Sequence, residues 1–75
     1  MMRLIVNAEK KTPGHDYSAF REELRSAEEL RPLPGGQFLI VTDQNIEAWA
    51  QRLGRTLGKE DSVLVTEHPG GKKSR

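Results

Sequence analysis

The chain has no cysteine, few aromatic residues and no long apolar run. Without cysteine it can form neither disulfide bonds nor thiolate metal sites. One Trp, one Tyr and two Phe are few for the stacking platforms of proteins that bind single-stranded nucleic acid. The longest apolar run near its start, Leu4–Val6, is much shorter than a membrane span or the core of a signal peptide. We therefore expect a cytoplasmic protein with no membrane partner.

Net charge and length set further limits. A chain of 75 residues has room for one small domain, and a domain of that size gains much stability from self-association. The formal charge of +1 is unevenly distributed, because Lys72, Lys73 and Arg75 carry three of the 12 positive charges. Residues 1–71 therefore hold 9 basic and 11 acidic residues, a net charge of −2. By net charge the folded part is not a basic platform for nucleic acid.

Three apolar runs predict strands. One spans residues 3–8 and reads as a central strand, Phe38–Val41 is the strongest strand run, and a last run follows at residues 62–66. The turn at Pro34–Gly36 precedes the second of these strands. The segment before that turn contains Pro32, which cannot donate to a strand ladder, so we expect an edge strand or an irregular arm there.

Two amphipathic helices are predicted between these strands. Apolar side chains recur at helical spacing over residues 17–28 and, more clearly, over residues 44–57. Asp16 is placed to cap the start of the first helix. Gly58 stands where a left-handed residue would end the second helix. Gly54 inside that helix indicates a close approach to a neighbouring element.

The predicted order of elements is strand, helix, strand, strand, helix, strand. Because each helix has a single apolar stripe, both can cover the same face of a four-stranded antiparallel sheet. This is the ferredoxin-like βαββαβ fold of the α+β class, which we expect over residues 2–67, followed by a flexible basic tail at residues 68–75. The other face of the sheet stays uncovered in a monomer.

Four segments of this layout carry a resemblance to a known family: Met2–Asn7, Pro13–Tyr17, Gly36–Thr42 and Glu60–Val65. Over about residues 2–67 the chain resembles the small CRISPR adaptation-subunit-like family, particularly its stand-alone bacterial and phage relatives. The resemblance implies a ferredoxin-like subunit that dimerises through its sheet and, in the CRISPR members, holds duplex DNA or acts as a metal-dependent nuclease. Those nucleases place a metal-binding Asp at the end of the first strand. This chain has Asn7 there, and a neutral amide binds a divalent cation more weakly than a carboxylate.

The candidate metal ligands lie at the end of the first strand and in the loop after it. Asn7 and Glu9 end the strand, and His15 and Asp16 follow. Divalent cations prefer several carboxylates, and this spacing matches no strong ligand motif, so helix caps and solvated turn residues are the simpler explanation. His15 beside Asp16 also resembles an oriented general base, but the sequence requires no reaction partner nearby. We therefore predict no cofactor and no catalytic residue.

Positive charge gathers at two places that are candidates for binding a nucleic-acid backbone. Arg52 and Arg55 are three residues apart, on a side of the second helix that we expect to be exposed. The tail adds Lys72, Lys73 and Arg75, each of which would make binding more sensitive to salt. A solvated helix face and a solubilising tail explain the same residues without a ligand.

Phe38 differs from the other aromatic residues, because strand alternation can direct it to the uncovered face of the sheet. There it suits a dimer interface better than RNA stacking, since no aromatic strand motif surrounds it. We therefore expect a small, non-catalytic, homodimeric interaction module. A metal-dependent nuclease, in which Glu9 or Asp16 compensates for Asn7, and a non-specific nucleic-acid binder are the alternatives.

Overall fold

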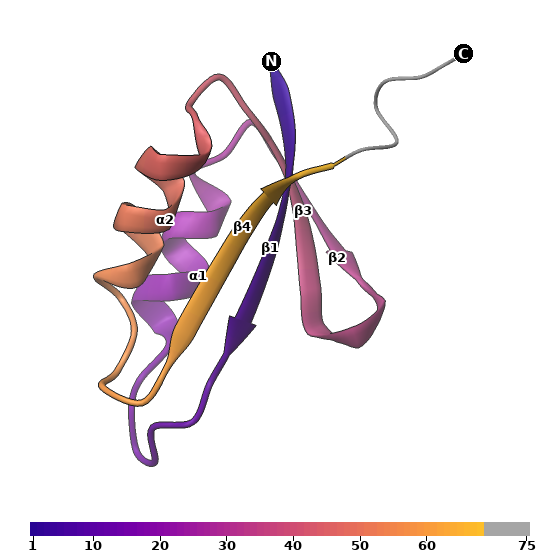
Figure 1. Cartoon of the computed structure of the whole chain (residues 1–75). Helices are drawn as coiled ribbons and strands as arrows, with labels where there is room; N and C mark the ends of the chain where they lie inside the picture. The colour runs from indigo at the N-terminus through magenta and orange to yellow at the C-terminus, as the bar shows by residue number, and fades with distance from the viewer. Residues whose placement is uncertain (69–75) are drawn as a thin grey trace.

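All the predicted strands and helices are present in the computed structural model, which describes residues 1–68 (Figure 1). The elements in chain order are β1 (Met2–Glu9), α1 (Ser18–Arg25), β2 (Glu29–Leu33), a short 3₁₀ turn (Pro34–Gly36), β3 (Gln37–Thr42), α2 (Ile46–Gly54) and β4 (Ser62–Glu67). This is the ferredoxin-like βαββαβ arrangement, so the predicted fold class is confirmed.

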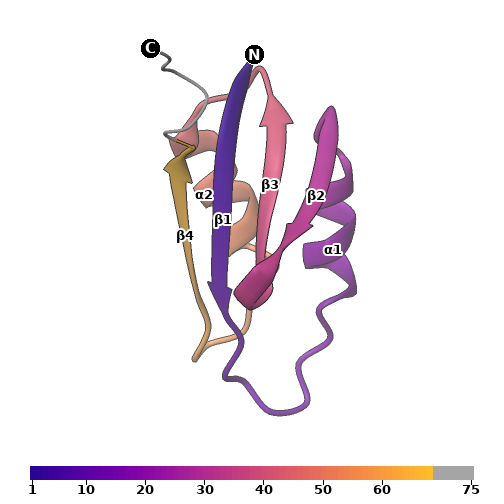
Figure 2. The same ribbon diagram turned by 90° about the vertical axis from the view of Figure 1, so that its right-hand side faces the viewer.

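The four strands form one antiparallel sheet in the order β2-β3-β1-β4. The two most apolar strands, β1 and β3, are central, as the sequence predicts. Pro32 lies in β2, at the edge of the sheet, where a proline is tolerated because an edge strand has a neighbour on one side only. Both helices lie on one face of the sheet, and Figure 2 views the sheet from the opposite, open face with the helices behind it.

The hydrophobic core lies between the helices and the sheet. Because side chains alternate along a strand, every second residue of each strand points toward the helices. In β1 these are Leu4 and Val6, which pair with Ile40 of β3 and Val65 of β4 respectively. The almost fully buried apolar residues are Leu4, Val6, Phe20, Leu24, Ile40, Trp49, Leu53 and Val65. The remaining strand residues point to the open face.

Helix α1 ends earlier than its apolar spacing predicts. It stops at Arg25 rather than at residue 28, because Ser26 turns the chain and donates a hydrogen bond from Oγ to the C=O of Glu23 (2.6 Å). The N–H of Glu28 then donates to the C=O of Val41 (2.9 Å), which leads the chain into β2. Residues 26–28 therefore lead into the pairing of β2 with β3 and do not continue the helix.

Helix α2 is also shorter than the predicted range of residues 44–57. Asn45 caps its start by accepting a hydrogen bond on Oδ1 from the N–H of Ala48 (2.8 Å). Beyond Gly54 the chain continues in turns, in which the N–H of Leu57 donates to the C=O of Gly54 (3.2 Å), and Leu57 still packs against the core. Neither α1 nor α2, the α-helices of residues 1–68, is long and apolar enough to cross a membrane.

The two glycines singled out by the sequence have other roles than predicted. Gly58 does not adopt a positive φ, and α2 ends at Arg55 in a right-handed conformation, so the predicted left-handed cap is wrong. A Cβ atom on Gly54 would meet nothing within 4 Å, so the predicted close approach is wrong there too. A Cβ on Gly58 would lie 2.6 Å from Oγ1 of Thr12, which makes Gly58 the position where two loops approach closely.

Candidate functional site

The candidate metal ligands do not converge in the structure. Asn7 and Glu9 are exposed and point to the open face of the sheet, and Glu9 forms an exposed ion pair with Lys11 (3.7 Å). Asp16 lies in the loop before α1 and is bonded to Ser18. Within residues 1–68, no three side chains of the His, Cys, Asp or Glu type come close enough together to hold a metal ion.

Asp16 and His15 both have structural partners. Oδ1 of Asp16 accepts hydrogen bonds from the Oγ (2.7 Å) and the N–H (2.9 Å) of Ser18, the first residue of α1. These bonds lower the pKa of Asp16. The N-cap position of α1 is Tyr17, so Asp16 satisfies the first N–H of the helix from one residue before the predicted cap position. Nε2 of His15 lies 2.8 Å from the C=O of Thr56, and the His15 ring packs edge-on against Tyr17 with 4.7 Å between ring centres.

Asp61 connects the loops at this end of the molecule, a role that the sequence does not indicate. Its carboxylate accepts five hydrogen bonds, from the N–H groups of Lys11, Thr12 and Gly58 and from the hydroxyl groups of Thr12 and Tyr17. Partial burial raises the pKa of Asp61, but the hydrogen bonds from Tyr17, Gly58, Lys11 and Thr12 outweigh it and hold the pKa well below its usual range. Most of these partners lie 44 to 50 residues away along the chain, so the sequence around Asp61 does not predict these hydrogen bonds.

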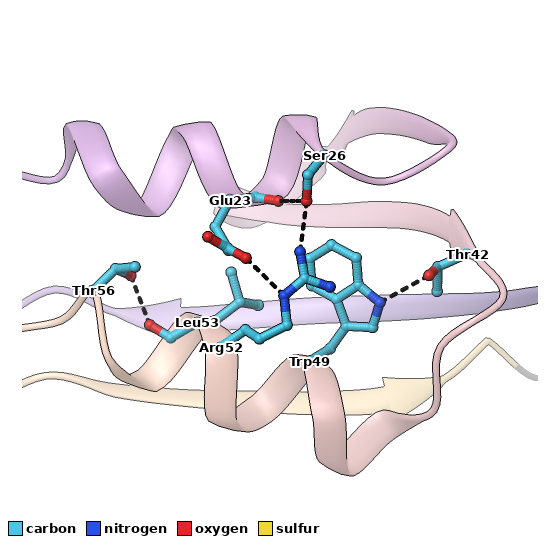
Figure 3. A network of polar contacts seen from close by, with 7 residues as sticks. All are labelled: Glu23, Ser26, Thr42, Trp49, Arg52, Leu53 and Thr56. Carbon is cyan, nitrogen blue, oxygen red and sulfur yellow. Dashed lines mark hydrogen bonds and ion pairs between the residues drawn. The ribbon is translucent and has the colours of Figure 1, made fainter.

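A second polar network joins α1 to α2 (Figure 3). Arg52 donates from Nε to Oε2 of Glu23 (2.6 Å) and from Nη2 to Oγ of Ser26 (2.8 Å). Its guanidinium carbon lies 4.2 Å from the centre of the Trp49 ring. Trp49 in turn donates from Nε1 to Oγ1 of Thr42, a buried hydrogen bond of 2.9 Å. The network therefore locks the two helices to each other and to β3.

The basic candidates do not form the shared exposed stripe that the sequence suggests. The Arg52 side chain is only 31% exposed and is committed to Glu23, so its predicted place on the exposed side of the helix is wrong. Arg55 is exposed just beyond α2. The tail candidates Lys72, Lys73 and Arg75 lie outside the described residues.

Phe38 points toward the helices and not to the open face. Its partner in β1 is Val6, a buried core residue, and Phe38 packs against the same core. With Leu24 and Leu30 it lines a hollow of about 120 Å³ beside α1. The prediction that Phe38 faces the open side is therefore wrong. Because all four residues of Phe38–Val41 are apolar, alternation does not reveal which pair the helices cover.

The open face of the sheet carries five apolar side chains, with polar side chains around and between them. Ile5 of β1 and Leu39 of β3 lie opposite each other on the two central strands. The open-face patch consists of Ile5, Leu33, Leu39, Val41 and Leu64. The polar side chains of this face, named the rim, are Arg3, Asn7, Glu9, Glu29, Arg31, Gln37, Ser62 and Thr66. Gln37 and Asn7 lie on the central strands, between Leu33 and Leu64.

Exposure of the open-face patch is most marked at Leu64, whose relative exposure is 60%. The other four patch residues are half-buried by their neighbours in the sheet. In Figure 2 no helix or strand of residues 1–68 lies in front of this face. Apolar patches rimmed by polar side chains are typical of protein interaction sites.

The chain matches no family model, and no curated protein or solved structure is significantly similar to it. The resemblance to the CRISPR adaptation-subunit-like family therefore stays a prediction. On the surface of residues 1–68, the open-face patch is the feature most relevant to function, because its apolar side chains are not buried by packing within the fold.

Proposed function

We propose that the protein is a non-catalytic interaction module that forms a homodimer through the open face of its sheet. The observation that carries the proposal is the open-face patch, five apolar side chains spread over the four strands on a face that no described element covers. Removing apolar surface from water contributes roughly 25 cal/mol per Å². A domain with one small core gains much from such burial.

The use of the other polar side chains supports an interaction role. Asp61 and Arg52 form hydrogen bonds to distant parts of the fold, and Asp16 forms them to the first residue of α1, so these side chains hold loops and helices in place. The nuclease alternative rests on Glu9 and Asp16, which have separate partners, Lys11 and Ser18 respectively. Within the described residues nothing specifically favours that alternative or the nucleic-acid binder.

Charge and size favour a second copy as the partner. The rim holds two basic residues, Arg3 and Arg31, and two acidic residues, Glu9 and Glu29, so two such faces do not repel each other. Four strands spaced about 4.8 Å apart and about 20 Å long give a face on the order of 400 Å². Two faces then bury about 800 Å², which is in the range of weak, transient interfaces and indicates an affinity no tighter than micromolar.

Sedimentation equilibrium from about 1 to 300 µM tests the proposal. We expect a monomer–dimer equilibrium for the unmodified chain. Leu39→Glu and Leu64→Glu should weaken it at least about tenfold, because each would bury an unpaired carboxylate in the interface. The matched control is Gln51→Glu on the exposed surface of α2, which makes the same charge change and should leave the equilibrium unaltered.

Two results would overturn the proposal. One is an unmodified chain that stays monomeric at the highest concentration, and the other is a dimer that tolerates both patch variants. Circular dichroism checks that Leu64→Glu still folds, as expected for a side chain that is 60% exposed in the monomer. Metal-dependent cleavage of DNA or RNA that disappears in Glu9→Ala or Asp16→Ala would contradict the non-catalytic part.

A further inference from the structure

We infer that two copies pair about a two-fold axis that runs parallel to the strands, between β1 and β3, so that Leu39 lies over the partner's Ile5 and Leu33 over the partner's Leu64. The inference rests on the proposed function and specifies the geometry of that homodimer. It follows from the register of the sheet together with the charges on its open face.

The register sorts the open-face side chains into three rows that cross the sheet. Each row is named here for its residue in β1. From β2 toward β4, the Arg3 row consists of Glu29, Val41 and Arg3. The Ile5 row consists of Arg31, Leu39, Ile5 and Thr66. The Asn7 row consists of Leu33, Gln37, Asn7 and Leu64. Gln37 and Asn7 lie opposite each other because their neighbours Phe38 and Val6 are paired.

Two sheets that pack face to face keep their strands within about 30° of each other, about 10 Å apart. In a homodimer with a self-complementary interface, the two-fold axis then lies between the sheets, either along the strands or across them. An axis along the strands places β3 over the partner's β1 and β2 over the partner's β4, with every row facing itself. An axis across the strands places each strand over itself and exchanges the Arg3 row with the Asn7 row.

The axis along the strands brings like side chains together. In the Ile5 row, Leu39 faces the partner's Ile5. In the Asn7 row, Leu33 faces the partner's Leu64, and the amide of Gln37 faces the partner's Asn7. The apolar side chain of Leu64, which is 60% exposed in the monomer, is thereby covered by another leucine.

Charge pairing points the same way. Under this axis Arg3 faces the partner's Val41, and the partner's Glu29 lies only one strand further, about 4.8 Å to the side. Within one copy, Arg3 and Glu29 are two strands apart. The dimer can therefore form the Arg3–Glu29 ion pair twice between copies, at two symmetric positions of the rim.

The axis across the strands is disfavoured by charge. It places Arg31 over the partner's Arg31, and like charges that face each other in an interface cost free energy. It also places Leu33 over the partner's Glu29, which removes the apolar contact at that corner of the open-face patch.

Because the chain has no cysteine, introduced thiols can report this geometry. Leu33→Cys and Leu64→Cys would be mixed in equal amounts and treated with a bifunctional thiol reagent that spans about 5–8 Å, as facing side chains of sheets about 10 Å apart require. We expect several-fold more covalent dimer in the mixture than in either variant alone. Arg31→Cys alone should give no more than background, whereas an axis across the strands would make it the most efficient single variant.

Charge reversal provides a second test. Arg3→Glu and Glu29→Arg should each weaken the dimer about threefold to tenfold, and the double variant should restore most of the loss. Cross-linking of Arg31→Cys, an unreactive mixture or a double variant without rescue would each overturn the geometry, even where sedimentation confirms the dimer. A chain that sediments only as a monomer would instead overturn the proposed function itself.

Discussion

The two faces of the sheet are built from the same four strands but are completed by different means. On one face, Leu4, Val6 and Ile40 lie under two helices and are 0% exposed. On the other face, Ile5 and Leu39 are only half-buried and Leu64 is 60% exposed. Both faces are apolar at their centres, so hydrophobicity alone does not distinguish them. What distinguishes them is that α1 and α2 cover one face and no helix of residues 1–68 covers the other.

The difference separates stability from interaction. The helix-covered face is closed by packing and by the Thr42–Trp49 and Asp61 networks, which hold the helices and loops against the sheet. The open face has no comparable internal cover in residues 1–68. Substitutions on the first face should therefore change the free energy of unfolding, and substitutions on the second should change association.

The largest contrast is expected from the same substitution on the two sides of the molecule. Leu53→Ala removes a fully buried side chain and should cost about 2–5 kcal/mol, a large part of the roughly 4–11 kcal/mol expected for a chain of this length. Leu64→Ala should cost less than about 0.5 kcal/mol in the monomer. Urea unfolding below about 1 µM, where the proposed dimer dissociates, measures both. Equal losses would show that the faces do not differ as described.

A smaller contrast is expected for two threonines. Thr42→Val leaves the buried Nε1–H of Trp49 without an acceptor and should cost about 1–3 kcal/mol. Thr66→Val keeps the β-branched shape on the exposed side of β4 and should stay within about 0.5 kcal/mol of the unmodified chain. Thermal unfolding measures both, since 1 kcal/mol corresponds to about 4–8 °C for a domain of this size. A stable Thr42→Val variant would mean that the Trp49 hydrogen bond contributes little.

The smallest effect is expected in the pH dependence at Asp61, because solvent reaches this site and screens its charge. An Asn side chain keeps only one of the two oxygens that accept hydrogen bonds there. Hydrogen bonds lower the pKa of folded Asp61, so the unfolded chain binds the proton more readily. The resulting stability is complete above the unfolded pKa of about 3.9 and is lost as the pH falls below it. Asp61→Asn should therefore reduce the fall in Tm between about pH 5 and pH 2.5.

Glu60→Gln is the control for this pH dependence. Glu60 is the exposed neighbour of Asp61, and only its backbone N–H takes part in the contact with Thr12. The variant should keep the pH dependence of the unmodified chain. An unchanged pH dependence in Asp61→Asn would show that the loop contacts do not distinguish the two protonation states.

Local signals were sufficient for the elements and their order. The apolar run around Leu4, the proline of the edge strand and the helical spacing around Trp49 each indicate their element correctly. They failed where two segments far apart in the sequence meet. Gly58 is needed because Thr12 lies against it, and Arg52 is withdrawn from the surface because Glu23 lies opposite on α1.

The sequence by itself determined the βαββαβ order, the central place of the two most apolar strands and the single apolar stripe of each helix, because periodicity and backbone chemistry act over a few residues. Only the tertiary structure decided that Phe38 faces the helices while Leu39 and Leu64 face outward. The physical reason is that a shift of one residue in strand pairing exchanges the two faces of a strand. An unbroken apolar run such as Phe38–Val41 is compatible with either choice until the helices and the neighbouring strands are in place.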